Sequence, residues 1–337
     1  MTDASLHRRA LLGAGALGLA LAAVPRARAA GGGVLAVMEK GEGALAFYDL
    51  DTGRLAERVS LGPYPHEFAV DRARTLAYVA HYGAKSSDEA GDGGTEVFTV
   101  DLAARRRGRS LDCRPFNRLH GIRMDARDRL HVLSEARDVL LGIDAPATQA
   151  HPVRAVTTGG IKGHLFALSG DGAHAYVSNI LSNTVTEVRP FAPSLPPRSV
   201  ETGLWPEGSA LSRDEASLYV ANRKSATVSV VDTGAMRVTR TLPTRGDVVR
   251  VALLPDGGLA LANFEEKSLS LWRPDLSEAA VVPLGAAPVA ITLHPDAPTA
   301  FVSLMNDRVA LVDLARAAVV REIATGREPD VAVLLPG

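Results

Sequence analysis

The chain has 337 residues, of which 46 % are hydrophobic, and its formal net charge is −1. This length suits one large all-β domain or two ordinary domains, and the balanced charge argues against a nucleic-acid-binding protein. Cys113 is the single cysteine, which excludes an internal disulfide and a cysteine-based metal cluster.

The N-terminus has the features of an export signal. His7-Arg8-Arg9 precedes an apolar run at residues 10–24, and an Ala-x-Ala pattern follows at residues 27–29. The run is too short for a membrane span. The arginine pair predicts a twin-arginine signal peptide over residues 1–30, with an ordinary secretory peptide as the alternative. We therefore expect an exported protein, periplasmic or extracellular, with one mature domain at residues 31–337 and no membrane span.

From residue 34 onward the chain reads as short alternating strands separated by Gly and Asp turns. One landmark recurs, the residue that opens an inner strand. It is found at His66, His120, His164, Glu207, Val249, Val289 and Asp330. The first step between landmarks is 54 residues and the others are 40–44, a period typical of four-stranded propeller blades.

A second strand follows each landmark in step. These strands are predicted at Val34–Glu39, Leu76–His81, Leu130–Ser134, Ala175–Asn179, Leu218–Asn222, Leu259–Asn263 and Thr299–Leu304. The first unit lacks an inner strand, whereas residues 329–335 supply an inner strand with nothing after it. Joining the two ends closes a ring without exposed sheet edges. The sequence thus predicts an all-β, seven-bladed propeller of four-stranded antiparallel blades.

The interval from His66 to His120 is longer than the other intervals between landmarks because it contains an insertion. Residues 81–95 insert a polar, Gly-rich loop between two strands of one blade. Long loops of this kind are more often functional than structural.

Polar landmarks are expected to meet at one mouth of the central channel. His66, His120 and His164 occupy equivalent positions in consecutive blades, which predicts a site for a divalent metal of unknown identity with an open coordination position. Glu207 or Asp330 would be a fourth ligand or a general base. Two alternatives stay open: a water-filled polar channel, and metal-free acid/base chemistry by histidine.

Further candidates lie at the same mouth. Glu67 and Arg250 follow the landmarks by one residue, and with Asp330 they are candidate ligand-binding residues. Tyr64 and Trp205 precede inner strands and could stack on a ligand. His81 ends a second strand and, with Glu207, is a catalytic candidate. Asn in the equivalent position of three other blades (Asn179, Asn222 and Asn263) is expected to satisfy turn backbone.

The whole mature chain resembles the YVTN type of seven-bladed propeller. The matching motifs are Tyr78-Val-Ala-His, Tyr176-Val-Ser-Asn and Tyr219-Val-Ala-Asn. The stretches that begin at Pro65-His66-Glu67 and Gly163-His164 are similar to strand starts of lactonase-type propellers. Streptogramin lyase is a further propeller enzyme, and that resemblance implies metal-linked roles for His120, His164 and Glu207.

We therefore expect a propeller that binds a small polar ligand at the channel mouth, with a divalent metal held by the three histidines. If it is an enzyme, the resemblance implies a metal-dependent lactone hydrolase or lyase. The alternative is a non-catalytic binding or protein-interaction propeller of the envelope. A small molecule is the expected partner, and a monomer the expected state.

Overall fold

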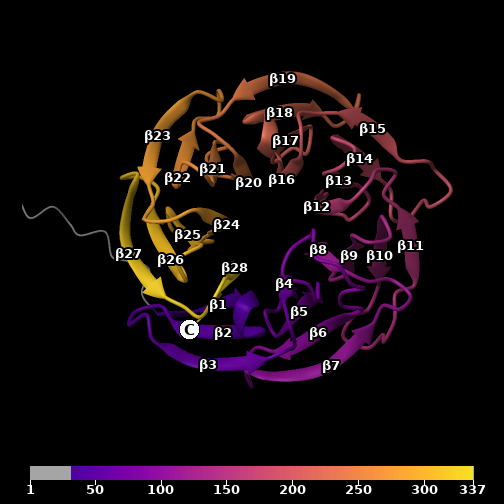
Figure 1. Ribbon diagram of the computed structural model, residues 1–337, viewed down its shortest axis with the longest axis horizontal. Helices are drawn as coiled ribbons and strands as arrows, with labels where there is room; N and C mark the ends of the chain where they lie inside the picture. The colour runs from indigo at the N-terminus through magenta and orange to yellow at the C-terminus, as the bar shows by residue number, and fades with distance from the viewer. Residues whose placement is uncertain (1–31, 337) are drawn as a thin grey trace, which may run out of the picture. The chain divides into compact units, whose positions relative to one another are not determined.

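The computed structural model describes residues 32–336, and the expected signal peptide lies outside them. In this part of the chain, 28 β-strands form seven four-stranded antiparallel sheets that stand as blades around a central axis (Figure 1). The prediction of an all-β, seven-bladed propeller is confirmed. No helix of the described residues is long and apolar enough to cross a membrane.

The strands of every blade run from the channel to the rim in the same order. The inner strands are β4 (Pro65–Val70), β8 (Leu119–Met124), β12 (Gly163–Leu168), β16 (Pro206–Leu211), β20 (Val248–Leu253), β24 (Pro288–Leu293) and β28 (Pro329–Pro336). The second strands are β1 (Gly33–Glu39), β5 (Leu76–His81), β9 (Leu130–Ser134), β13 (Ala175–Asn179), β17 (Ser217–Asn222), β21 (Leu259–Asn263) and β25 (Thr299–Leu304).

The remaining strands complete the blades. The third strands are β2 (Ala44–Asp49), β6 (Glu96–Asp101), β10 (Val139–Ile143), β14 (Thr184–Val188), β18 (Thr227–Asp232), β22 (Ser268–Trp272) and β26 (Arg308–Asp313). The outer strands are β3 (Leu55–Ser60), β7 (Arg106–Asp112), β11 (Arg154–Thr157), β15 (Arg198–Glu201), β19 (Arg237–Pro243), β23 (Glu278–Pro283) and β27 (Ala318–Ala324). Two short 3-10 helices in the described residues follow second strands, η1 (Lys40–Glu42) and η2 (Arg223–Ser225).

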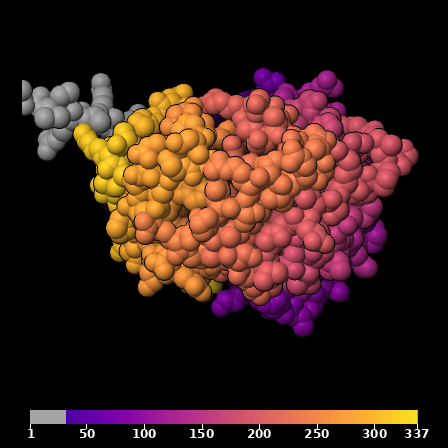
Figure 2. Space-filling model, turned by 90° about the horizontal axis from the view of Figure 1, so that it is seen from above, coloured from indigo at the N-terminus to yellow at the C-terminus, as the bar shows by residue number. Residues whose placement is uncertain are grey.

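Strand composition follows position in the blade. Second and third strands are packed between neighbouring blades on both faces, so they read as continuous apolar runs such as the buried Leu259–Asn263. Outer strands have one face in solvent, and β3 keeps only Val59 buried among its six residues. Figure 2 shows this outer wall on the side formed by residues of about 200 to 300.

The two ends of the described chain meet in one blade. β28 pairs antiparallel with β1, with Leu335 opposite Val34 and Ala332 opposite Val37. The sheet order β28-β1-β2-β3 confirms the predicted closure of the ring. No blade in the described residues is left with three strands.

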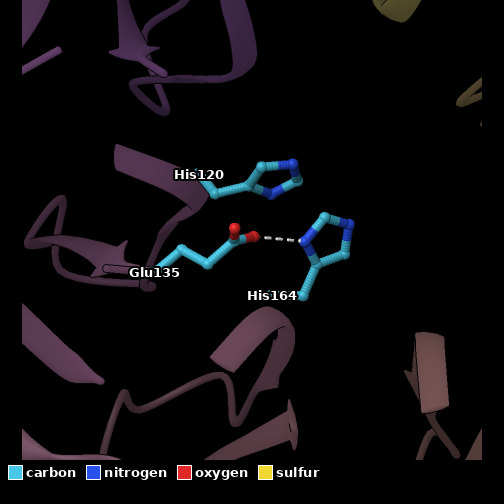
Figure 3. Close-up of side chains that lie close together, drawn as sticks. All are labelled: His120, Glu135 and His164. Carbon is cyan, nitrogen blue, oxygen red and sulfur yellow. Dashed lines mark hydrogen bonds and ion pairs between the residues drawn. The ribbon is translucent and has the colours of Figure 1, made fainter. Parts of the chain in front are cut away.

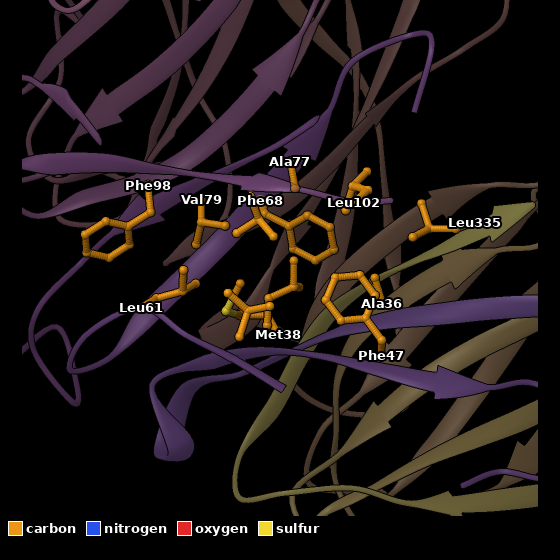
Figure 4. Close-up of a cluster of buried hydrophobic side chains, with 13 residues drawn as sticks. Ala36, Met38, Phe47, Leu61, Phe68, Ala77, Val79, Phe98, Leu102 and Leu335 are labelled. Carbon is orange, nitrogen blue, oxygen red and sulfur yellow. The ribbon is translucent and has the colours of Figure 1, made fainter. Parts of the chain in front are cut away.

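Hydrophobic contacts between neighbouring blades hold the ring together. Between the first two blades, Met38 and Phe47 pack against Phe68 and Phe98, and Leu335 of β28 joins them (Figure 4). Burial of such large side chains stabilises the fold by roughly 1.5–3 kcal/mol each. Similar clusters lie between other blades, so the core is distributed around the ring.

The inner strands are irregular where they begin. In every blade the register between the inner and second strands shifts near this end, as between Pro65 and Phe68 in β4 or Leu119 and Ile122 in β8. Such β-bulges redirect side chains and are common beside functional sites. Here they lie where the landmark residues enter the channel.

Candidate functional site

Three histidines lie side by side where β4, β8 and β12 begin. The ring centroids of His66 and His120 are 4.2 Å apart, and those of His120 and His164 are 3.9 Å apart. Because the three residues open equivalent strands of consecutive blades, the ring geometry stacks their imidazoles. We call His66, His120 and His164 the histidine row.

The stacking determines what the histidine row can bind. Neighbouring rings are tilted by 40° and 31°, so their in-plane lone pairs do not all aim at one point. A single ion shared by three imidazoles would therefore require at least one ring to rotate. The Nδ1 atoms of His66 and His120 are buried without a hydrogen-bond partner. Unpartnered buried nitrogens of this kind are candidates for ligand or metal binding.

A buried carboxylate holds the third histidine. Glu135 Oε2 lies 2.6 Å from His164 Nδ1, and Glu135 Oε1 accepts a 2.6 Å hydrogen bond from the Tyr82 hydroxyl. In Figure 3 the Nε2 atoms of His164 and His120 both point away from Glu135, on the same side of the two rings. A carboxylate that accepts from one ring nitrogen fixes the tautomer and leaves the other nitrogen free for a ligand.

Burial and neighbouring groups control the protonation of His66, His120 and Glu135. Burial, and the positive charge of Lys40, hold the pKa of His66 well below its usual value, and burial and the neighbouring histidines do the same for His120. Burial would raise the pKa of Glu135, but hydrogen bonds from His164 and Tyr82 and the charge of Lys162 hold it below the usual range. The site thus places neutral imidazoles beside an ionised carboxylate.

A second set of groups surrounds His66. Its Nδ1 lies 3.1 Å from Asp330 Oδ2, and Lys40 Nζ lies 3.2 Å from the same oxygen and 3.4 Å from His66 Nε2. Two sets of residues offer ligand atoms within 4.8 Å of one another: His120, Glu135 and His164 in one, and His66, Glu67 and Asp330 in the other. The lysine disfavours a cation in the second set, so the first is the better candidate metal centre.

Arg250 connects three buried carboxylates at the inner-strand starts of different blades. Its guanidinium lies 3.1 Å from Glu67, 3.6 Å from Glu207 and 3.9 Å from Asp330. Burial would lower the pKa of Arg250, but these three carboxylates raise it. Glu207 also pairs with Arg223 at 3.3 Å. The predicted residues Glu67, Glu207, Arg250 and Asp330 are therefore brought together as one ion-pair network.

Three other candidates lie apart from the histidine row. His81 Nε2 lies 3.1 Å from the carbonyl oxygen of Pro63, and its ring packs on Phe98 within its own blade. This placement corrects the expectation that His81 is catalytic, because its side chain turns into the blade. Trp205 lies under the Lys224 ammonium, 3.5 Å from the ring centroid. Tyr64 adopts a left-handed backbone conformation before β4 and, like Trp205, makes no contact with the histidine row among the described interactions.

The Asn series has a structural role, but Asn222 and Asn263 bond to hydroxyl groups of the third strand and not to turn backbone as expected. Asn222 donates from Nδ2 to the Ser229 hydroxyl at 2.8 Å, and Asn263 donates to Ser270 at 2.9 Å. Both bonds join the second strand to the third strand of the same blade. These amides therefore hold blades together and do not reach a ligand.

Sequence reasoning missed the residues that directly follow the second strands. These are Lys40, Tyr82, Glu135, Ile180, Arg223, Phe264 and Met305, one from each blade. Lys40, Tyr82 and Glu135 contact the histidine row or its partners. This position lies one residue beyond the Asn series, so the predicted ends of the second strands already define it. Comparing the residues at this position in all seven blades would have identified Lys40, Tyr82 and Glu135.

The inserted loop is tied down at the mouth. Arg118 donates to the carbonyls of Ser87 at 3.2 Å and Gly91 at 3.0 Å, and also to that of Glu89. Lys162 donates to the Ser87 carbonyl at 3.1 Å. Since Arg118 and Lys162 each lie two residues before a histidine of the row, the loop covers that side of the channel.

Comparison with known proteins gives similarity in fold. No protein-family model and no curated protein matches the chain. A periplasmic gluconolactonase of Pseudomonas aeruginosa, PpgL, has a TM-score of 0.72 at 16 % identity and covers 90 % of this chain and 99 % of its own.

Two further solved structures are similar to this chain. A functionally unknown protein of Desulfotomaculum acetoxidans has a TM-score of 0.73 at 11 % identity, and the match covers 90 % of this chain and 99 % of that protein's chain. Hydrazine synthase of Kuenenia stuttgartiensis has a TM-score of 0.67 at 15 % identity, and the match covers 81 % of this chain and 90 % of that chain. The expected resemblance to lactonase-like seven-bladed propellers is thus confirmed at the level of the fold.

Proposed function

We propose that the protein binds a small polar ligand at the channel mouth and hydrolyses a lactone there with the help of a divalent ion. The histidine row carries this proposal. His120 keeps a buried, unpartnered Nδ1, and its ring, that of His164 and the carboxylate of Glu135 offer ligand atoms close to one another. Nitrogen and oxygen donors of this kind suit such an ion. The similarity in fold to a periplasmic gluconolactonase supports a lactone as the substrate class.

The residues divide into two roles. His120 and His164 hold the ion, and Glu135 keeps His164 in place through Nδ1. A bound divalent ion supplies Lewis-acid chemistry that polarises the substrate carbonyl and activates water. His66, with Asp330 beside its Nδ1, takes the proton of the attacking water. The water oxygen bonds to the carbonyl carbon, the ring C–O bond breaks, and His66 returns the proton to the leaving oxygen to give the hydroxy acid.

The alternative role of His66 follows from the sequence. As a third metal ligand it would complete a site of three imidazoles, after rotation of its ring away from Lys40. Glu207 and Arg250 then serve the ligand, because the ion-pair network to which both belong reaches Asp330 beside His66.

The test uses the full-length protein purified without a histidine tag. We expect about one divalent ion per chain, acid release from an added aldonolactone, and loss of both in His164→Ala. His151→Ala is the matched control, because His151 is exposed and bonds only to the Asp112 carbonyl among the described contacts. Metal content and hydrolysis that persist in His164→Ala would contradict the proposal.

The shallow tilt between the imidazole rings favours a second candidate function. Stacked rings suit a polar binding channel without a metal, as in a non-catalytic envelope propeller. This candidate predicts saturable binding of a lactone or hydroxy acid by the metal-free protein, without turnover. Isothermal titration beside the metal analysis separates the two functions.

We also infer that the protein is exported. The arginine pair at residues 8–9 with the apolar run after it supports this, as does the periplasmic location in the name of the similar gluconolactonase. Replacement of Arg8 and Arg9 by Lys should leave unprocessed protein inside the cell. Processed protein outside the cytoplasm would instead indicate the general secretory route.

A further inference from the structure

Three large apolar side chains are exposed close together beside the channel mouth. Ile161, Leu181 and Leu204 keep 57 %, 53 % and 54 % of their surface exposed. We call them the apolar patch. The patch extends over the fourth and fifth blades, from the loops that enter β12 and β16 and the loop that leaves β13.

Hydrogen bonds between the loops keep the apolar patch together. The Leu181 N–H donates to the Ile161 carbonyl at 3.2 Å. Asn183, two residues further on, accepts from the Trp205 N–H at 2.9 Å, next to Leu204. The three side chains therefore stand on one bonded set of loops.

The apolar patch is continuous with the proposed site. Ile180 is the residue of the fourth blade that follows its second strand, the position that Tyr82 and Glu135 hold in the two preceding blades. Its side chain is buried, and its N–H donates to the Lys162 carbonyl at 3.1 Å, two residues before His164. The buried Ile180 thus connects, along the chain, the exposed Leu181 to the repeat position that faces the histidine row in the two preceding blades.

Resting on the proposed function, we propose that the substrate is amphiphilic: a lactone whose ring binds at the histidine row and whose alkyl or acyl chain lies on the apolar patch. The size of the patch favours a chain over a protein partner, because stable protein interfaces involve roughly 20–30 residues on each side. The backbone bond from Ile180 to Lys162, two residues before His164, brings the edge of the patch near the proposed position of the ring.

The test is a homologous series of γ-lactones with ethyl, butyl and hexyl substituents, with unsubstituted γ-butyrolactone as the reference. Each methylene that is fully buried adds roughly fourfold to affinity, and a half-exposed patch buries it in part. We therefore expect affinity, or 1/KM, to rise by roughly two- to fourfold for each added methylene in the native protein. Ligand concentrations are kept below those at which the lactones form micelles.

Two variants locate the effect. Ile161→Ser and Leu181→Ser should flatten the rise with chain length and leave the binding of γ-butyrolactone unchanged. The control is Val320→Ser, since Val320 is 55 % exposed on the outer strand β27 and should keep the native slope. Exposed positions are chosen so that the variants fold.

The outcomes separate this inference from the proposed function. A flat series in the native protein, with γ-butyrolactone still bound, overturns the amphiphilic substrate and leaves the proposed function intact. An undiminished slope in both patch variants overturns it too, because the chain then binds elsewhere. Failure to bind any lactone overturns the proposed function, and the inference that depends on it.

Discussion

Burial decides the protonation of the central imidazoles. His120 is 1 % exposed and lies between two other histidines, so the cost of removing a positive charge from water favours its neutral form. Glu135 is also buried, yet donors on His164 and Tyr82 keep it ionised. Burial thus gives opposite outcomes, because donors stabilise the carboxylate of Glu135, whereas His120 Nδ1 has no hydrogen-bond partner among the described residues.

Burial and hydrogen-bond donors also oppose each other at Asp125, which lies on a turn remote from the channel mouth, and this leads to a prediction for its stability contribution. Its carboxylate accepts from the backbone N–H groups of Arg127 and Arg129 and from Arg129 Nε at 2.6 Å. Burial opposes ionisation, but these donors lower the pKa of Asp125 below its usual value. Asp125→Asn should therefore destabilise the fold at neutral pH by about 2 kcal/mol.

The dependence on pH has a definite sign. Since the folded-state pKa is depressed, the ionised carboxylate stabilises the fold above the unfolded pKa of about 3.9, and this contribution is lost as pH falls through the folded value. Urea unfolding should show the gap between native protein and Asp125→Asn closing below about pH 4. Asp88→Asn, at a side chain 83 % exposed, is the control. A gap that stays constant with pH would refute the assignment.

Among the elements, the inserted loop after β5 depends on side chains from outside its blade. Arg118 donates to three of its carbonyls, and Asn117 donates to that of Asp92. The loop has little apolar burial, since residues 85–92 are mostly exposed. Segments with few buried contacts open locally at low free-energy cost. The loop should therefore respond to loss of these donors without unfolding of the blade.

We predict that Arg118→Gln speeds hydrogen exchange in residues 84–93 by roughly tenfold or more, because charge-assisted hydrogen bonds contribute about 1.5–3 kcal/mol. The melting temperature should change little, since the loop is not part of the core. Hydrogen exchange with mass spectrometry measures the first result, and a thermal scan by circular dichroism measures the second. Arg106→Gln, at an exposed arginine of β7, should leave the loop unchanged. Unaltered exchange in Arg118→Gln would show that the loop is held by its own contacts.

For the whole molecule, stability depends on closure. β28 supplies Leu335 to the cluster between the first two blades and Ala332 to the cluster between the first and last blades. Deletion of residues 329–337 should unfold or aggregate the protein, because it exposes the edge of β1 and opens both clusters. Circular dichroism and size-exclusion chromatography measure the result. A truncated protein that melts at the native temperature would contradict this account of closure.

The sequence predicted the ring well and the site in part. A period of 40–44 residues with alternating strands gave the blade number, and the seven second strands begin and end within one residue of their predicted bounds. The meeting of Glu67, Arg250 and Asp330 followed from strand register. The stacking of the imidazoles did not, because bulges set side-chain direction at the inner-strand starts. The inward turn of His81 likewise depends on packing, whereas Lys40 and Glu135 stand at a fixed place in the repeat, directly after a second strand.

The pairing of β28 with β1 also has a consequence for biosynthesis. Translation proceeds from the N-terminus, so β1, β2 and β3 are made before the other strands and lack their inner strand until β28 follows. Asp330 belongs to β28, and its contacts with Lys40 and His66 join residues that are made far apart in time. The nascent chain therefore lacks part of the candidate site until β28 has been made and has paired with β1.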